Sequence, residues 1–252
     1  MIKADISRAR KFLTDQEYIH AHTLATKGLE EVRQKTGPGS EWLGWRDLLA
    51  KPNLNLITQL TQLGKEIHAS ADVFIVCGIG GSYLGAKAVI DALTPAFTAK
   101  GPEILFAGHH MSGAYLNDLL AYLKTPKADG SKKSVVLNVI SKSGSTLETA
   151  LSFRVLRKFI HEEFEDASDR IICTTSEAGG VLNEVIDQEG YQKFIIPSDI
   201  GGRFSVLTPV GLLPIAVAGI SIEALFKGAV SNYQALEDDA DVIVEYAALR
   251  NA

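Results

Sequence analysis

The amino-acid sequence predicts an α/β fold built on a parallel sheet. From Asp72 onward, short apolar runs of strand length alternate with longer stretches of helical periodicity, a pattern typical of βαβ units. The run DVFIVCG, which begins at Asp72, is continuously apolar after its first residue, as expected of a strand buried on both faces. Turns rich in glycine or hydroxyl groups follow several of these runs. We therefore expect ligand-binding residues beyond the carboxyl ends of the strands.

A helical segment is expected over residues 1–66, before the first strand. Apolar side chains recur at helical spacing from Tyr18 to Val32, and this run ends at a Gly-Pro-Gly turn at 37–39. Asn53 is placed to cap a further helix.

Five strands and four intervening helices are expected after this segment. The strands are 72–78, 103–107, 134–140, 170–175 and 192–196, and the helices are 83–93, 112–123, 146–163 and 178–188. The helix over 146–163 is expected from the helical spacing of Leu147, Leu151, Val155 and Phe159. The later apolar run 206–222 is interrupted by Pro209 and Pro214. It favours the start of a buried helix over a membrane span.

Composition excludes several classes of function. The chain has 252 residues, 46% of them hydrophobic, and a net charge of −5, which argues against a nucleic-acid partner. No apolar leader opens the sequence, so we expect no membrane association. Cys77 and Cys173 both lie in apolar runs. They are expected to be buried thiols in a reducing, cytoplasmic compartment.

The stretch NVISKSGSTLET, from Asn138 to Thr149, reads as a strand, a tight turn at Gly144 and the first turn of a helix. Hydroxyl groups and free backbone N–H groups at a helix N-terminus suit a phosphate. The residues that could bind it are Ser141, Lys142, Ser143, Ser145 and Thr146. Ser145 and Glu148 also have the spacing of a capping box. On these residues alone, phosphate binding and simple helix capping are equally supported.

A second glycine-rich turn, CGIGGSYLG at 77–85, follows the first strand. Its spacing does not fit GxGxxG, because Tyr83 occupies the place of the third glycine, and no acidic residue follows at the position that a ribose requires. A nicotinamide-dependent dehydrogenase is therefore disfavoured. Two such strand ends converging on one crevice indicate a phosphorylated metabolite.

The last strand leads into IPSDIGGRFSVLTPVG, residues 196–211. Two glycines, Gly201 and Gly202, precede Arg203, so a sharp turn could present its guanidinium to a phosphate or a developing oxyanion. The alternative is a structural ion pair between Arg203 and Asp199, which composition alone favours.

Three motifs, GIGGSYLGAKAV, NVISKSGSTLETALSFRV and DIGGRFSVLTPVGLLPIAVAGI, together resemble the glucose-6-phosphate isomerase family, most closely from about Asp72 to Asn251. The resemblance implies a sugar-isomerase domain over residues 67–220, with a five-stranded parallel sheet flanked by helices. It implies that Gly81 and Ser82 contact the open-chain sugar. The implied phosphate site comprises Ser141, Lys142 through its backbone, Ser143 and Thr146, with a hydroxyl retained at Ser145. Arg203 would stabilise an enediolate, and we add Gly202 to the substrate-binding residues.

The resemblance also implies a reaction. Glucose 6-phosphate and fructose 6-phosphate would interconvert through a cis-enediolate, a step of glycolysis and gluconeogenesis, with no cofactor and no metal. Family members continue into a second sugar-isomerase domain that carries the catalytic glutamate, a histidine and a lysine. Residues 221–252 are accordingly expected to be a helical linker towards that domain, and the family is usually homodimeric.

Glu148 and Asp199 are poor substitutes for the missing base. The adjacent His109 and His110 would face opposite ways on a strand. The alternative function is a phosphosugar-binding module without turnover.

Overall fold

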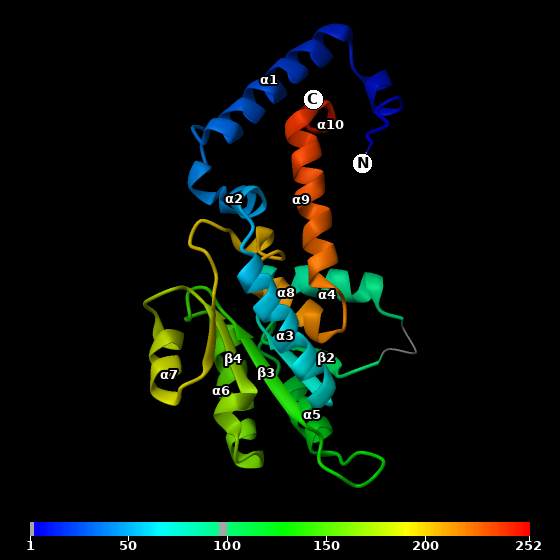
Figure 1. Cartoon of the computed structure of the whole chain (residues 1–252). Helices are drawn as coiled ribbons and strands as arrows, with labels where there is room; N and C mark the ends of the chain where they lie inside the picture. The colour runs from blue at the N-terminus through cyan, green and yellow to red at the C-terminus, as the bar shows by residue number, and fades with distance from the viewer. Residues whose placement is uncertain (1–2, 96–99) are drawn as a thin grey trace. The chain divides into compact units, whose positions relative to one another are not determined.

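A computed structural model describes residues 3–95 and 100–252 (Figure 1). These residues form two compact units. The first runs to Pro52 and resumes at Ala224, and the second comprises Asn53–Glu223. Among the described helices, none is both long enough and apolar enough to cross a membrane.

The first unit is helical and joins sequence from both ends of the chain. Its elements are η1 (Ala9–Phe12), α1 (Asp15–Gln34), η2 (Ser40–Trp42), α2 (Gly44–Ala50), most of α9 (Ile222–Asp238) and α10 (Asp241–Asn251). Thr14 and Glu17 form a capping box that starts α1. Helix α1 packs against α10. Glu237 of α9 accepts ion pairs from Arg33, at 3.4 Å, and Arg46, at 2.9 Å. These contacts hold together segments about two hundred residues apart in sequence.

The second unit is built on a five-stranded parallel sheet, which confirms the predicted fold class. Its strands are β1 (Val73–Cys77), β2 (Glu103–Ala107), β3 (Val135–Ile140), β4 (Ile171–Thr175) and β5 (Gln192–Ile195), in the order β2-β1-β3-β4-β5. The direction in which successive strands are added reverses at β1, which pairs with both β2 and β3. Such a switch in strand order opens a crevice at the carboxyl ends of the strands.

The helices of this unit are α3 (Leu54–Ser70), α4 (Gly81–Leu93), α5 (Gly113–Lys124), α6 (Leu147–Glu163), α7 (Val181–Glu189) and α8 (Pro209–Val217), with short turns η3 (Ala167–Arg170) and η4 (Gly202–Phe204). Asn53 caps α3 as predicted, because its side chain accepts from the Leu56 N–H at 3.1 Å. Helix α7 begins later than predicted. Gly179 and Gly180 before it have φ of 74° and 82°, which is outside the helical region.

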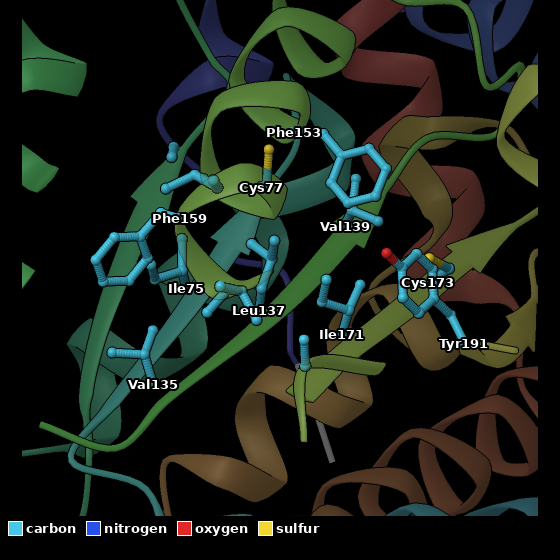
Figure 2. Close-up of a cluster of buried hydrophobic side chains, with 14 of the residues drawn as sticks. Ile75, Cys77, Val135, Leu137, Val139, Phe153, Phe159, Ile171, Cys173 and Tyr191 are labelled. Atoms are coloured by element: carbon cyan, nitrogen blue, oxygen red, sulfur yellow. The ribbon is translucent and has the colours of Figure 1, made fainter. Parts of the chain in front are cut away.

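One face of the sheet carries the main hydrophobic core. Alternate strand residues such as Ile75, Leu137 and Ile171 point to the side that also receives Phe153 and Phe159 of α6 (Figure 2). Cys77 and Cys173 are buried, unpaired thiols in this core, as predicted.

Helix α8 packs against both α3 and α4 in the same unit. Helix α8 is buried at every residue, which confirms the prediction of a buried helix within 206–222. A Cβ at Gly64 of α3 would lie 2.5 Å from the Cβ of Ala216 of α8. A glycine is therefore what permits these two helices to approach so closely.

Candidate functional site

The turns that follow β1 and β5 touch each other through their backbones. Gly81 is the first residue of α4, and a Cβ placed on it would lie 2.1 Å from the Gly202 carbonyl oxygen and 2.9 Å from the Arg203 nitrogen. The Ser205 hydroxyl donates to the Gly202 carbonyl at 2.7 Å and lies 3.4 Å from the Gly81 carbonyl. The structure thus brings together Gly81 and the glycine pair before Arg203, which are about 120 residues apart in sequence.

The turn after β3 presents hydroxyl groups at the start of α6. Gly144 has a φ of 69°, and a Cβ there would lie 3.0 Å from the Leu182 nitrogen, so this turn requires glycine. The Ser143 hydroxyl oxygen lies 3.2 Å from both the Ser145 nitrogen and the Ser145 hydroxyl. Helix α6 begins at Leu147 after Thr146, whose side chain makes no capping bond. The alternative capping box of Ser145 and Glu148 is therefore wrong, because the helix starts one residue too late for it.

Ser141 combines a fixed backbone with a spare hydroxyl. Its N–H donates to the Thr174 carbonyl at 3.1 Å, and its carbonyl accepts from the Thr175 hydroxyl at 2.7 Å. The side-chain Oγ is buried and has no hydrogen-bond partner among the described residues. A buried hydroxyl without a partner costs free energy, so it indicates a group that a ligand would satisfy.

The Lys142 side chain connects two of the turns. Its ammonium group donates to the Ser198 carbonyl at 2.7 Å and the Ile200 carbonyl at 3.1 Å, both in the turn after β5. This ammonium group therefore fixes the turn that leads to Arg203.

Arg203 lies in η4 and is exposed. Within residues 3–95 and 100–252, no ion pair joins it to Asp199, so the structural alternative considered for this arginine is not found there. Ser82, also among the predicted site residues, is half-buried in the first turn of α4. The predicted residues thus occupy the carboxyl ends of β1, β3 and β5, which lie at one edge of the sheet.

An aromatic cluster beside β2 was not expected from the sequence. The rings of His109 and His110 lie 4.3 Å apart, and both also contact the Tyr115 ring. The expectation that the histidines face opposite ways applied to a strand, and they follow the end of β2 and are not part of it. Tyr83 of α4 lies 5.2 Å from His109. Burial and the neighbouring His110 lower the pKa of His109.

The described part of the chain offers no cluster of metal ligands. No group of three or more His, Cys, Asp or Glu side chains there is arranged to hold a metal ion.

The strand order and the loops at its switch point are those of the doubly wound α/β class, whose members bind ligands beyond the carboxyl ends of their strands. The sequence model of one family, phosphoglucose isomerase, matches residues 59–239. The chain belongs to the phosphoglucose isomerase family.

Curated relatives agree with this membership. The chain is 42% identical over 266 residues to a glucose-6-phosphate isomerase of Alkaliphilus metalliredigens, which covers 100% of this chain and 57% of the relative. It is 42% identical over 260 residues to the enzyme of that name from Fusobacterium nucleatum, covering 99% and 56%. The chain thus spans a little over half the length of the curated relatives it matches.

Two solved structures are similar in fold. A hypothetical protein from Thermus thermophilus matches with a TM-score of 0.74 and 29% identity over 88% of this chain and 50% of that one. A glucose-6-phosphate isomerase from Chlamydia trachomatis matches with a TM-score of 0.56 and 24% identity, over 73% of this chain and 34% of that one. The second likeness concerns the fold alone.

Proposed function

We propose that this chain supplies the phosphosugar-binding part of an aldose–ketose isomerase that interconverts glucose 6-phosphate and fructose 6-phosphate. Membership of the family and the names of its relatives support the reaction. The observation that carries the proposal is the contact of Gly81 with Gly202 and Arg203 beside the hydroxyl-rich turn of β3. One edge of the sheet thereby offers an anion site and a guanidinium.

The phosphate of the sugar binds at the N-terminus of α6 in this proposal. Its oxygens accept from backbone N–H groups of residues 142–146 and from the hydroxyls of Ser141, Ser143 and Thr146, and the helix dipole favours the negative charge. Ser145 adds a further hydroxyl at the rim. The unpartnered Ser141 Oγ supports this placement, since a phosphate oxygen would satisfy it.

The sugar chain then extends towards α4 and η4. Gly81 and Ser82 contact it, and Gly202 lets the backbone approach closely. Arg203 stabilises the negative charge that develops on the enediolate oxygens when a carbon-bound proton is removed. Moving that proton between C1 and C2 needs a base within hydrogen-bond distance.

None of the residues assigned to the site supplies such a base. Glu148 lies in the first turn of α6 beside the proposed phosphate, where a bound dianion disfavours a second negative charge nearby. Asp199 precedes the turn and makes no ion pair with Arg203 in the described part of the chain. We infer that the 252 residues alone bind the sugar phosphate without converting it. The complete enzyme would carry the base on a second domain, act as a homodimer and work in the cytoplasm, where buried free thiols such as Cys77 persist.

Calorimetry with fructose 6-phosphate tests the binding. Ser141→Ala should weaken the binding of fructose 6-phosphate and of inorganic phosphate alike by about ten-fold, because a charge-assisted hydrogen bond is lost. Arg203→Gln should leave the affinity for inorganic phosphate unchanged. It should weaken the binding of a phosphorylated hydroxamate analogue of the enediolate about ten-fold to a hundred-fold.

A coupled assay on the same preparation tests turnover. No conversion is expected. Binding of unphosphorylated fructose as tight as that of fructose 6-phosphate would contradict the anion site, and conversion by the verified 252-residue chain would contradict the absence of a base.

A further inference from the structure

A cavity of about 540 Å³ lies between α6 and α7 and reaches the turn after β3, where Ser141 and Gly144 line it. Figure 1 shows these two helices on the same side of the sheet. Val139 of β3, Phe153 of α6 and Leu182 of α7 form an apolar interior, and Figure 2 shows the Phe153 ring beside Val139. A cavity of this size and character suits a small ligand with an aromatic or short aliphatic body.

One wall of the cavity is basic. Four side chains of α6 line it at spacings of three and four residues, which place them on one face of the helix. They are Arg154, Arg157, Lys158 and His161. The cavity extends along α6 from Thr149 to His161, a distance of about 18 Å at the rise of an α-helix. This wall therefore suits a ligand that carries negative charge.

Two of these four groups, Arg157 and His161, are held by the Tyr191 hydroxyl just after the end of α7. Arg157 donates to the Tyr191 hydroxyl at 2.9 Å and pairs with Glu189, and the His161 ring lies 2.8 Å from the same hydroxyl. Arg154, in contrast, makes no hydrogen bond or ion pair with any residue that the structure describes.

Lys158 has only an exposed pair with Glu162 at 3.5 Å, and pairs of this kind contribute little. Arg154 and Lys158 are thus available to an anion at the edge of the apolar interior.

The inner end of the cavity offers a different group. Ser141 lines it, is 6% exposed, and its Oγ has no hydrogen-bond partner within the described residues. Thr149, the other hydroxyl nearby, lies within reach of the Gly108 carbonyl at 3.5 Å. The cavity therefore presents a spare hydroxyl at one end, apolar side chains in its middle and two cations at its mouth.

We propose that this cavity is a binding site for a hydroxyaryl carboxylate, which shares the Ser141 Oγ with the proposed sugar-phosphate site. The carboxylate pairs with Arg154 and Lys158, because a guanidinium and an ammonium at an apolar edge bind it with little water between them. The ring packs against Phe153, and its phenolic hydroxyl bonds to the Ser141 Oγ. A simple fatty acid fills the same volume but leaves Ser141 without a partner.

The proposal does not depend on the proposed isomerase function. Neither Ser143 nor Thr146 nor Arg203 lines the cavity. Ser141 and Gly144 border both sites, so a phenol bonded to the Ser141 Oγ and a phosphate bonded to the same atom would compete for it.

Calorimetry with 3-(4-hydroxyphenyl)propionate tests the site on the full chain. The corresponding amide, which lacks the charge, should bind about ten-fold more weakly. 3-Phenylpropionate, which lacks the hydroxyl, should bind about three-fold to ten-fold more weakly. Affinities that are equal for the acid and the amide would overturn the proposal.

Three variants locate the binding. Arg154→Gln should weaken the binding of the acid about ten-fold and leave the affinity for the amide unchanged. Arg250→Gln, which makes the same charge change on exposed α10 outside the cavity, should leave both unchanged. Ala150→Phe places a ring in the mouth of the cavity from an exposed helical position and should abolish binding while far-UV circular dichroism stays that of wild type. Equal effects of Arg154→Gln and Arg250→Gln, or full binding by a folded Ala150→Phe variant, would refute it.

Discussion

Gly81→Ala is the most direct test of how the two glycine-rich turns meet. A Cβ at this position would lie 2.1 Å from the Gly202 carbonyl oxygen and 2.3 Å from its carbonyl carbon. Ordinary van der Waals contact begins at 3.4 Å, so the backbones would have to separate by about 1.3 Å. No side-chain rotation can relieve this contact, because both partners are backbone.

The expected cost is therefore at the upper end of the range for overpacking, about 3 kcal/mol of unfolding free energy. Gly113→Ala is a matched control. Gly113 is also the first residue of a helix that follows a strand, and a Cβ there meets nothing within 4 Å. This variant should stay within about 0.5 kcal/mol of wild type.

Urea unfolding followed by far-UV circular dichroism measures the difference between the two variants. Both tryptophans of the chain, Trp42 and Trp45, lie in the first unit. Their fluorescence reports the unfolding of that unit, while circular dichroism also follows the sheet. If Gly81→Ala and Gly113→Ala unfold at the same urea concentration by circular dichroism, the turns are not in contact and the reasoning fails. Gly81→Ala should also bind fructose 6-phosphate more weakly than Gly113→Ala.

Two further predictions concern buried groups of the sheet. Thr174→Val removes the donor to the Asn138 amide oxygen, a 3.2 Å bond between two fully buried residues. It should cost about 1–3 kcal/mol, whereas the double variant Thr174→Val/Asn138→Leu should recover most of this in urea unfolding; equal costs would contradict the role of the bond. Burial raises the pKa of the Cys77 and Cys173 thiols to about 12. At pH 8 only about one such thiol in ten thousand is ionised, so a disulfide reagent should label neither in the folded chain and both in urea; rapid labelling of the folded chain would disprove their burial. Because the folded pKa lies above the ordinary value of 9.0, the unfolded chain releases these protons first. Their contribution to stability should be complete below about pH 9 and be lost as the pH rises towards 12.

The strands were the easiest part of the fold to predict. A buried parallel strand needs an unbroken apolar run. Strand β2 has the predicted bounds, β1 is one residue shorter than predicted at each end, and β3 starts one residue later than predicted. Glycine and hydroxyl clusters at strand ends correctly indicated which turns lie at one edge of the sheet, since that edge follows from parallel pairing.

Contacts between distant segments were beyond the reach of the sequence. The helical spacing of apolar residues predicted the position of α6 in the sequence. It did not predict which face of that helix is buried, because more than one face shows the same spacing. Leu147 and Leu151 are 57% and 44% exposed, whereas Thr149 and Ser152 are buried. The choice of face depends on the strands beneath the helix and not on the period of its own residues.

The start of α6 depends on similar detail. The Ser143 hydroxyl lies against Ser145, and Thr146 takes the N-cap position. Such local hydrogen bonds compete with helix capping. Composition alone therefore does not show whether Ser145 or Thr146 takes the N-cap position. The contact of Gly81 with Gly202 is likewise beyond the sequence, because β3 and β4 lie between β1 and β5 and only the path of the turn after β5 brings the two glycines together.

Helix α8 has a consequence for how the chain is made. All five strands have been synthesised by Ile195, but α8 ends only at Val217. Helix α3 is synthesised long before α8. Leu60 and the surface around Gly64 therefore stay uncovered until Ala216 has been synthesised. During that interval a nascent chain holds apolar surface in water, which is the state most prone to aggregation. Slowing translation between codons 196 and 217 would prolong that state.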